Sequence, residues 1–309
     1  MNEQQISTRP YKLSHQNCPL CSQQSRRLFR KHGYWICACQ GCQHRFAEID
    51  TSIAHVNQVY SDQYFYGGGA GYPNYLAEEK ILTKHGQRYG RLISRYMQPG
   101  TVLDVGSAAG FILKGLVDCG WQGRGIEPNP YMADYARTRL GLKVNVGTLE
   151  QLQTGQRYDL VNMIQVLGHF FNLEQALQVA SDHTKVGGFW LMETSNRESI
   201  TSRILGNNWH MYSPPSVLHW FTPGTLRQLV AEFGFREVAR GKPEKWIMAS
   251  HAKSVLGYKL QGSPVGKIIA RMLNIIPDHL SLPYPAEDLF WILFQKCDRA
   301  KDSGTIRQS

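Results

Sequence analysis

The sequence lacks three kinds of segment that would argue against an ordinary globular protein. Its 309 residues contain no apolar run long enough to cross a membrane. The first ten residues, MNEQQISTRP, lack the apolar centre of a secretory signal, so we expect a cytoplasmic protein. No run of five or more like charges is present either. With 42% hydrophobic and 19% charged residues, the chain is expected to form one large domain and a small module.

Acidic residues are outnumbered by basic ones, and the formal net charge is +10. Such a balance permits an acidic partner, such as RNA, a nucleotide-linked substrate or a membrane surface, without requiring one. The densest basic group, which consists of Arg26, Arg27, Arg30 and Lys31, is also explained as a solvated face. Because no aromatic stripe for stacking RNA bases accompanies the charge, a nucleic-acid partner is permitted but not favoured.

The dinucleotide-binding fingerprint G-x-G-x-x-G is absent from the stretch where it would be expected. Residues 101–110 read TVLDVGSAAG, which predicts a buried strand and a turn of small residues, and a helical pattern begins at Phe111. Ala108 stands where the second glycine of the fingerprint would let pyrophosphate approach the backbone, which argues against NAD. Asp104 lies at the carboxyl end of the predicted strand, where open α/β sheets bind their ligands.

A second acidic residue, Glu127, follows about twenty positions after this turn. Residues 122–127 read QGRGIE and predict the next strand, with Glu127 at its end. A carboxylate at this spacing and at a second strand end is typical of one that binds a ribose diol. Alone, the same residue would be interpreted as a surface group, so the pairing with the turn favours nucleoside binding.

Together, LDVGSAAG and GIEPNP make the chain similar to the class I S-adenosylmethionine (SAM) methyltransferases. It most resembles a bacterial subgroup with an amino-terminal zinc ribbon, the methyltransferase-23-like proteins, from about Cys18 to about Lys296. The resemblance implies a Rossmann-like α/β fold, with a mostly parallel sheet whose last strand is antiparallel. It also implies SAM as the cofactor, contacted by Asp104, Gly106, Ser107, Ala108, Gly110, Glu127, Pro128, Leu149, Glu150, Gln165 and Tyr64.

Two segments in this set have a second interpretation. In the resembling family the turn at residues 147–150 meets the adenine, but a short capped helix explains Leu149 and Glu150 equally well. Residues 60–75, YSDQYFYGGGAGYPNY, show neither a helical nor a strand period and could form a flexible linker. The resemblance instead implies a tyrosine-rich lid over the SAM site, whose candidate contacts are Tyr64, Tyr66 and Tyr75.

Five of the seven cysteines lie between Cys18 and Cys42. Cys18 and Cys21 form one C-x-x-C pair, and Cys39 and Cys42 form a second, which predicts a tetrahedral zinc site. Four thiolates leave no position for a water molecule, so the zinc is expected to be structural and needed for this small module to fold. Cys37 could replace Cys39 as a ligand, although the two-residue spacer favours Cys39.

A buried strand is predicted over residues 159–167, and Gly168-His169-Phe170 follows it. The family usually has an acidic residue before this histidine, and Gly168 stands in its place. His169 is the first candidate to take a proton from a substrate hydroxyl, with an ordinary packing histidine as the alternative. The missing acid leaves the tautomer of the imidazole without an obvious anchor.

Residues 208–222, NWHMYSPPSVLHWFT, are the second segment without a period. Pro214-Pro215 forbids a helix there, while the aromatic rings and histidines suit a substrate pocket. Packing of the loop beneath the lid is the alternative interpretation. His219 is the second candidate for a general base.

The sequence suggests a zinc ribbon over residues 1–50, a lid segment and helix over 51–98, and a SAM-binding domain over 99–300. A polar, disordered tail is expected from 301 to 309. Helices are expected at 76–96, 129–140, 172–184 and 223–233, strands at 142–146, 159–167, 189–193, 235–249 and 288–295, and an amphipathic insertion at 254–275.

The most specific hypothesis is SAM-dependent O-methylation of a small molecule or a glycan, with His169 or His219 as the base. An RNA methyltransferase of the rRNA type keeps the same fold with a different acceptor. A non-catalytic SAM-binding protein is the third hypothesis, because Ala108 and Gly168 both depart from the expected patterns. The sequence does not indicate an oligomeric state.

Overall fold

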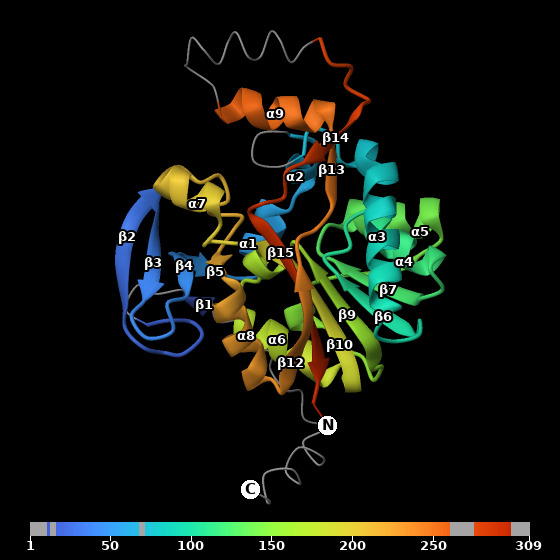
Figure 1. The fold of residues 1–309 in the computed structure, drawn as a ribbon, viewed down its shortest axis with the longest axis horizontal. Helices are drawn as coiled ribbons and strands as arrows, with labels where there is room; N and C mark the ends of the chain where they lie inside the picture. The colour runs from blue at the N-terminus through green and yellow to red at the C-terminus, as the bar shows by residue number, and fades with distance from the viewer. Residues whose placement is uncertain (1–10, 13–16, 68–71, 260–274, 298–309) are drawn as a thin grey trace, which may run out of the picture.

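The computed structural model describes residues 11–12, 17–67, 72–259 and 275–297 (Figure 1). The tail predicted from residue 301 lies outside these residues, as does most of the amphipathic segment predicted at 254–275. A large α/β body and a smaller antiparallel sheet lie side by side, with the smaller sheet on the left in Figure 1.

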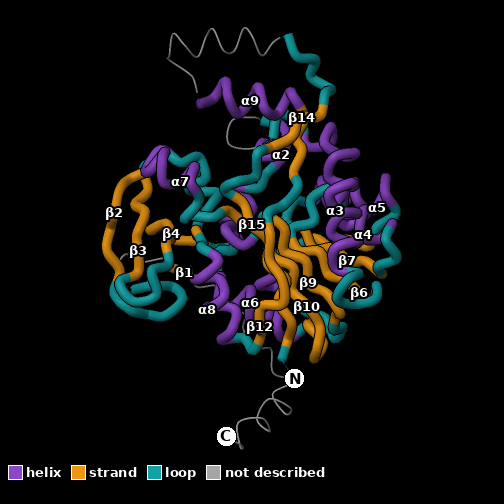
Figure 2. Tube along the Cα trace, viewed as in Figure 1, coloured by secondary structure: helices purple, strands orange, loops and turns teal. Residues whose placement is uncertain are grey.

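Seven strands form the central sheet in the order β12-β15-β10-β9-β6-β7-β8 (Figure 2). Their bounds are Thr101–Val105 for β6, Gln122–Glu127 for β7, Lys143–Val146 for β8, Tyr158–Ile164 for β9, Thr184–Ser195 for β10, Phe235–Gly241 for β12 and Leu289–Lys296 for β15. Strand β15 runs antiparallel to β10 and β12, whereas the other neighbouring pairs are parallel. The predicted mostly parallel sheet with an antiparallel last strand is confirmed.

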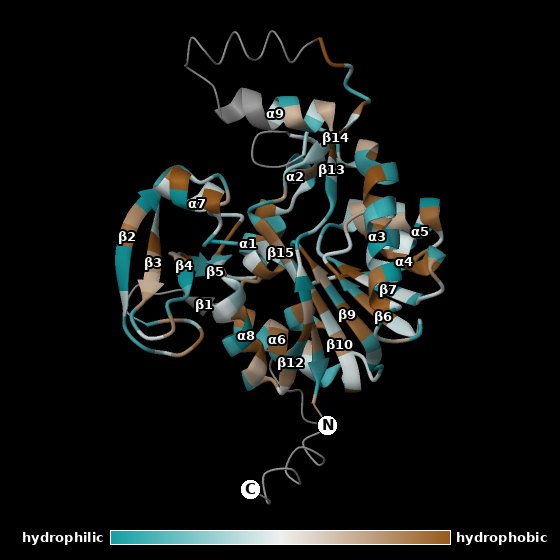
Figure 3. Cartoon of the chain, in the orientation of Figure 1, coloured by the Kyte–Doolittle hydropathy of each residue, from teal (hydrophilic) through white to brown (hydrophobic). Residues whose placement is uncertain are grey.

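Helices cover both faces of this sheet. Helices α6 and α8 pack with Leu103 and Val161 in one apolar cluster, whereas α3, α4 and α5 pack with Val102 and Leu160 in another. Neighbouring residues of a strand therefore face opposite helical layers, as expected for strands buried on both sides. Figure 3 shows the hydrophobic colouring along the central strands. The helices are α3 (Glu79–Ile93), α4 (Phe111–Asp118), α5 (Pro130–Leu140), α6 (Leu173–Asp182) and α8 (Pro223–Glu232).

The small sheet contains β2 (Ser25–Lys31), β3 (Tyr34–Cys39) and β4 (Arg45–Glu48) from the amino-terminal part. Its fourth strand, β11 (His219–Trp220), comes from the segment predicted as a loop and pairs antiparallel with β4. Apolar side chains from both parts form one cluster beneath this sheet. The amino-terminal strands and the segment around residues 209–220 thus share a sheet and a core.

Two stretches differ from the sequence-based prediction. The aperiodic segment contains the helix α2 (Asp62–Tyr66), and α1 (Ile53–Val59) precedes it; a helix of five residues is too short to leave a periodic pattern. The strand predicted over 235–249 is broken at Pro243, which has no N–H for a ladder. After this break, β13 (Lys245–Met248) leaves the main sheet and pairs with β14 (Ser281–Tyr284).

Several boundaries shift and the remaining elements are short. The helix predicted over 76–96 begins as the 3-10 turn η1 (Tyr75–Glu78) and continues as α3. The others are β1 (Tyr11–Lys12), β5 (Asp50–Thr51), η2 (Leu149–Gln151), η3 (Leu167–His169), α7 (Ile200–Leu205), η4 (Gly206–Asn208) and α9 (Ala249–Lys259). Within the described residues, no helix has the length and hydrophobicity that a membrane crossing requires.

Candidate functional site

The turn after β6 lies at the carboxyl ends of the central strands. Gly106 has a φ of 65°, and a Cβ there would lie 2.5 Å from Cγ1 of Val166, so only glycine fits. Ala108 is also left-handed, with a φ of 46°, which is uncommon for a residue with a side chain. Gly110, with a φ of 83°, caps the start of α4. The turn is compact, and of its five residues only Gly106 is not fully buried.

Asp104 and Asn162 lie opposite each other on β6 and β9, near the carboxyl ends of these strands. Asn162 Nδ2 donates to Asp104 Oδ1 at 2.5 Å. Asp104 Oδ2, Asn162 Oδ1 and Ser107 Oγ are buried and have no hydrogen-bond partner among the residues that the structure describes. Burial raises the pKa of Asp104 to about 7, although its bond to Asn162 opposes the shift. Unpaired buried polar atoms cost about 1–3 kcal/mol each, so this group suits a polar ligand.

Glu127 ends β7 and lies against the same turn. Its Oε2 accepts a hydrogen bond from Ala108 N at 2.8 Å, and its Oε1 accepts one from Asn129 N at 2.8 Å. Burial raises the pKa of Glu127 to about 7, and these two N–H groups lower it in part. Pro128 lies partly buried between Glu127 and Asn129. The two strand ends that the sequence predicted as the ligand site therefore lie together. Each carboxylate oxygen of Glu127 keeps a lone pair for a further donor.

The predicted adenine residues lie on the short helix η2. Leu149 is buried in the core beside Val105 and Ile126. Glu150 Oε1 accepts hydrogen bonds from Phe171 N at 3.1 Å and Asn172 N at 3.5 Å, so this carboxylate holds the entry to α6. Burial raises its pKa to about 7. The structure thus contains the alternative short helix, and contact with adenine stays a prediction for both residues.

The segment around Tyr64 packs on the turn rather than away from it. Phe65 and Tyr75 share an apolar cluster with Ala108, Ala109 and Phe111. Burial raises the pKa of Tyr64 to about 12, and the Glu127 carboxylate adds to the shift because it lies nearby. Tyr66, by contrast, is exposed and contacts the ring of Tyr131.

His169 lies on η3, beyond the end of β9, and its side chain is partly buried. Its Nδ1 lies 2.6 Å from the hydroxyl of Tyr60 and 2.7 Å from the carbonyl oxygen of Ser216. Burial lowers its pKa, and the Ser216 and Gln165 carbonyls oppose this shift. Both of these contacts are made by Nδ1, and the carbonyl of Gln165 is a third polar group beside the imidazole.

His219 is fully buried and uses both ring nitrogens. Its Nε2 lies 3.2 Å from the carbonyl oxygen of Phe170, and its Nδ1 lies 3.1 Å from Nε2 of His44. Burial lowers its pKa to about 3. Because the carbonyl requires a proton on Nε2, Nδ1 accepts from His44, and no ring atom of His219 is left for a substrate.

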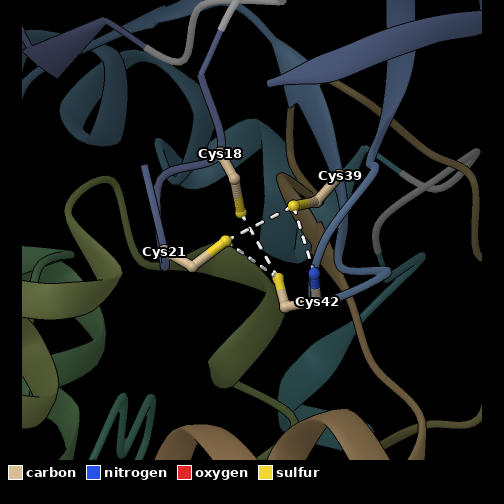
Figure 4. A group of neighbouring side chains, drawn as sticks. All are labelled: Cys18, Cys21, Cys39 and Cys42. Atoms are coloured by element: carbon tan, nitrogen blue, oxygen red, sulfur yellow. Dashed lines mark hydrogen bonds between the residues drawn. The ribbon is translucent and has the colours of Figure 1, made fainter. Parts of the chain in front are cut away.

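The four cysteines predicted as metal ligands form one group (Figure 4). Their sulfur atoms all lie within 4.8 Å of one another, with 3.6 Å between Cys18 and Cys42 and 3.4 Å between Cys21 and Cys39. Sulfurs at about 2.3 Å from a tetrahedral zinc lie about 3.8 Å apart, so the group fits that ion. Cys37 is buried in the core of the small sheet instead. Cys39, and not Cys37, completes the group, as predicted.

The geometry agrees with a comparison to protein families. The model of the methyltransferase-23 family, described as a methyltransferase domain, matches residues 81–239, slightly more than half of the chain. The chain belongs to this family of SAM-dependent methyltransferases.

Similar proteins of known sequence or structure extend this result. A ubiquinone biosynthesis O-methyltransferase of Rickettsia prowazekii (strain Madrid E) is 29% identical over 156 residues, which cover 45% of this chain and 60% of the relative. The protein of the same name from Rickettsia felis is 32% identical over 128 residues, covering 36% and 52%. The chain thus spans between half and 60% of the length of these curated relatives.

Among solved structures, a "putative methyltransferase" of Bacillus halodurans C-125 has a TM-score of 0.51 and 14% identity, covering 69% of this chain and 99% of that one. A chain from the complex between the Haloferax volcanii Trm112 methyltransferase activator and a methyltransferase has a TM-score of 0.50 and 14% identity, covering 72% and 94%. At this identity the likeness concerns the fold alone.

One buried polar cluster of this methyltransferase was not predicted from the sequence. Glu193, near the end of β10, accepts hydrogen bonds from His85 Nε2 at 3.0 Å, from Gln165 Nε2 at 2.7 Å and from the hydroxyl of Tyr89. Although burial alone would raise it, His85, Lys245 and Tyr89 hold the pKa of Glu193 at about 2. Gln165 has a φ of 58° and points to this cluster. His85 and Tyr89, four residues apart on the apolar face of α3, were the available clue.

Proposed function

We propose that this methyltransferase transfers the methyl group of SAM to a hydroxyl group of a small molecule or glycan. The observation that carries the proposal is the buried, unpaired polar edge of Asp104 and Asn162 beside the turn and Glu127. Its resemblance to O-methyltransferases favours an oxygen acceptor. When bound, SAM supplies a methyl group that its sulfonium has already activated.

The residues that would hold SAM divide by chemistry. Asp104 and Asn162 offer unpaired acceptors to the cationic methionine end, and the backbone of the turn lies beside them. The free lone pairs of Glu127 suit the two ribose hydroxyls. We propose Leu149 and Glu150 for the adenine side, where Leu149 supplies apolar surface. Tyr64 and its neighbours would cover the site and exclude water.

We propose His169 as the general base. Its Nε2 would take the hydroxyl proton as the acceptor oxygen gains the methyl group, so the oxygen never carries a full extra charge. His219 is the weaker candidate because both of its ring nitrogens are engaged in the interior. Alignment of the hydroxyl with the methyl group, together with exclusion of water, supplies the rest of the rate.

We further propose that Cys18, Cys21, Cys39 and Cys42 bind a structural zinc ion, and that residues 1–50 form the zinc ribbon. Four sulfur ligands complete a tetrahedral site, so this ion would take no part in the chemistry. The shared sheet with β11 means that the ribbon would support the segment beside His169.

The proposal is tested by calorimetry with SAM, S-adenosylhomocysteine and NAD, followed by transfer of labelled methyl groups to phenols, catechols and sugars. We expect binding of the first two ligands, no heat with NAD, and label on an acceptor oxygen. His169→Ala should lower turnover by about 100-fold or more while SAM affinity changes little. Equal and modest effects on both would remove His169 from the reaction. Binding without transfer to any acceptor would favour a non-catalytic protein, and label in rRNA would favour the RNA alternative.

A further inference from the structure

We propose that Tyr60 is a positioning residue that sets the tautomer of His169 and couples this base to the SAM-binding edge. The inference rests on the proposed function of His169, and Tyr60 itself need not touch a substrate. Tyr60 makes two separate contacts. Its hydroxyl lies against His169, and its backbone carbonyl accepts a hydrogen bond from Asn129, in the turn after β7.

The proton positions follow from three polar atoms that lie close together. The hydroxyl of Tyr60, Nδ1 of His169 and the carbonyl oxygen of Ser216 are mutually 2.6–2.7 Å apart. The carbonyl can only accept, and the tyrosine has a single proton to donate. If Nδ1 carried no proton, its lone pair would face the carbonyl oxygen of Ser216, which cannot donate. This holds whether the Tyr60 hydroxyl donates to Nδ1 or to the carbonyl. A proton on Nδ1 resolves this conflict.

With that proton in place, every atom of the group is satisfied. Nδ1–H donates to the Ser216 carbonyl, the Tyr60 hydroxyl donates to the same carbonyl, and the Tyr60 oxygen lies beside Nδ1–H as a second acceptor. Nε2 of His169 must then carry the lone pair, which is the form that a base requires. This neutral arrangement performs the task that an acidic residue at position 168 would perform, where this chain has Gly168.

The second contact connects Tyr60 to the proposed ribose site. Nδ2 of Asn129 donates to the carbonyl oxygen of Tyr60 at 3.0 Å and to Oδ1 of Asp62 at 3.0 Å. The N–H of Asn129 donates to Glu127 Oε1. A ligand held by Glu127 therefore acts on the same short turn that anchors Tyr60, and through it on His169.

The test uses Tyr60→Phe, which keeps the ring and removes the hydroxyl. We expect kcat to fall about 10-fold with SAM affinity and KM for SAM within about twofold of wild type. Tyr96→Phe, at an exposed tyrosine outside this network, serves as the matched control and should leave all three unchanged. A fall in affinity equal to the fall in kcat, or no change in kcat, would overturn the positioning role of Tyr60.

A spectroscopic measurement on the unmodified protein tests the tautomer without any activity. Long-range ¹H–¹⁵N NMR spectra distinguish Nδ1–H from Nε2–H, and the spectrum of His169→Gln identifies the signal among the 11 histidines. We expect Nδ1–H in the wild type and a detectable share of Nε2–H in Tyr60→Phe. A wild-type proton on Nε2 would overturn the inference even if Tyr60→Phe failed to fold.

The two proposals fail in different ways. If His169→Ala keeps its turnover, the proposed base is wrong, whatever the NMR spectrum shows. If His169→Ala is inactive but Tyr60→Phe matches wild type in kcat and in tautomer, His169 remains the base and the positioning residue is wrong.

Discussion

Nε2 of His44 and Nδ1 of His219 lie 3.1 Å apart in the interior, where neither side chain is exposed. His44 lies two residues after Cys42, and His219 lies on β11, which pairs with β4. The residue before His219, Leu218, donates its N–H to the carbonyl oxygen of Gly168 at 2.6 Å. The cysteine group and the turn that carries His169 are therefore connected through a single small sheet.

This connection predicts that the proposed zinc site supports catalysis from a distance. We expect Cys39→Ser, or removal of zinc with a chelator, to lower the melting temperature and to abolish most of the turnover, because the ribbon would no longer hold β11. Zinc content, thermal unfolding and methyl transfer measure the effect. Cys119→Ser, whose thiol lies outside the group and donates to Gln87 O, is the control and should retain zinc and activity. Full turnover without zinc would refute the connection.

Glu127→Gln should weaken SAM binding by about 10–100-fold, measured by calorimetry. Both carboxylate oxygens of Glu127 accept backbone N–H bonds, so an amide would turn its own NH2 group toward one of these donors. Glu79→Gln, at an exposed position in the first turn of α3, should bind SAM as the wild type does. Unchanged affinity in Glu127→Gln would exclude this carboxylate from the SAM site.

The raised pKa of Asp104 predicts how stability changes with pH. The folded value is about 7 and the ordinary value is 3.8, so between these limits the folded state binds the extra proton and stability falls as pH rises. Buried histidines with lowered pKa values, such as His219, act in the opposite direction below about pH 6.5. The comparison is therefore between wild type and Asp104→Asn, whose melting temperature should rise relative to wild type from pH 5 to pH 8. A constant difference across this range would contradict the prediction.

The two candidate histidines should respond differently to removal. His219→Ala leaves His44 Nε2 and the Phe170 carbonyl without partners, so we expect a loss of about 1–3 kcal/mol in the free energy of unfolding. Its turnover, measured well below the melting temperature, should exceed that of His169→Ala, which keeps its fold. Denaturant unfolding and single-turnover kinetics separate the two effects. A His219→Ala protein that is stable but inactive would reverse the assignment.

The local patterns of the sequence were sufficient for the features that depend on neighbouring residues. The strand, small-residue turn and helix of residues 101–118 follow from hydrophobic period and glycine geometry, and the two C-x-x-C pairs follow from spacing. Their correct prediction has a common cause, since each is set by side chains within a few positions of one another. The mostly parallel sheet with an antiparallel last strand followed from the family resemblance rather than from any local pattern, and the order of the strands came only from the structure.

Only the tertiary structure decided which distant groups meet. Tyr60 reaches His169 across 109 positions, and His44 reaches His219 across 175, contacts for which no local pattern exists. The same applies to Glu150, whose carboxylate turns to the backbone before α6 because that entry has free N–H groups to satisfy. The sequence by itself determined the chemical groups and their places on strand ends; packing determined which nitrogen, oxygen or sulfur of each group is paired and which remains free.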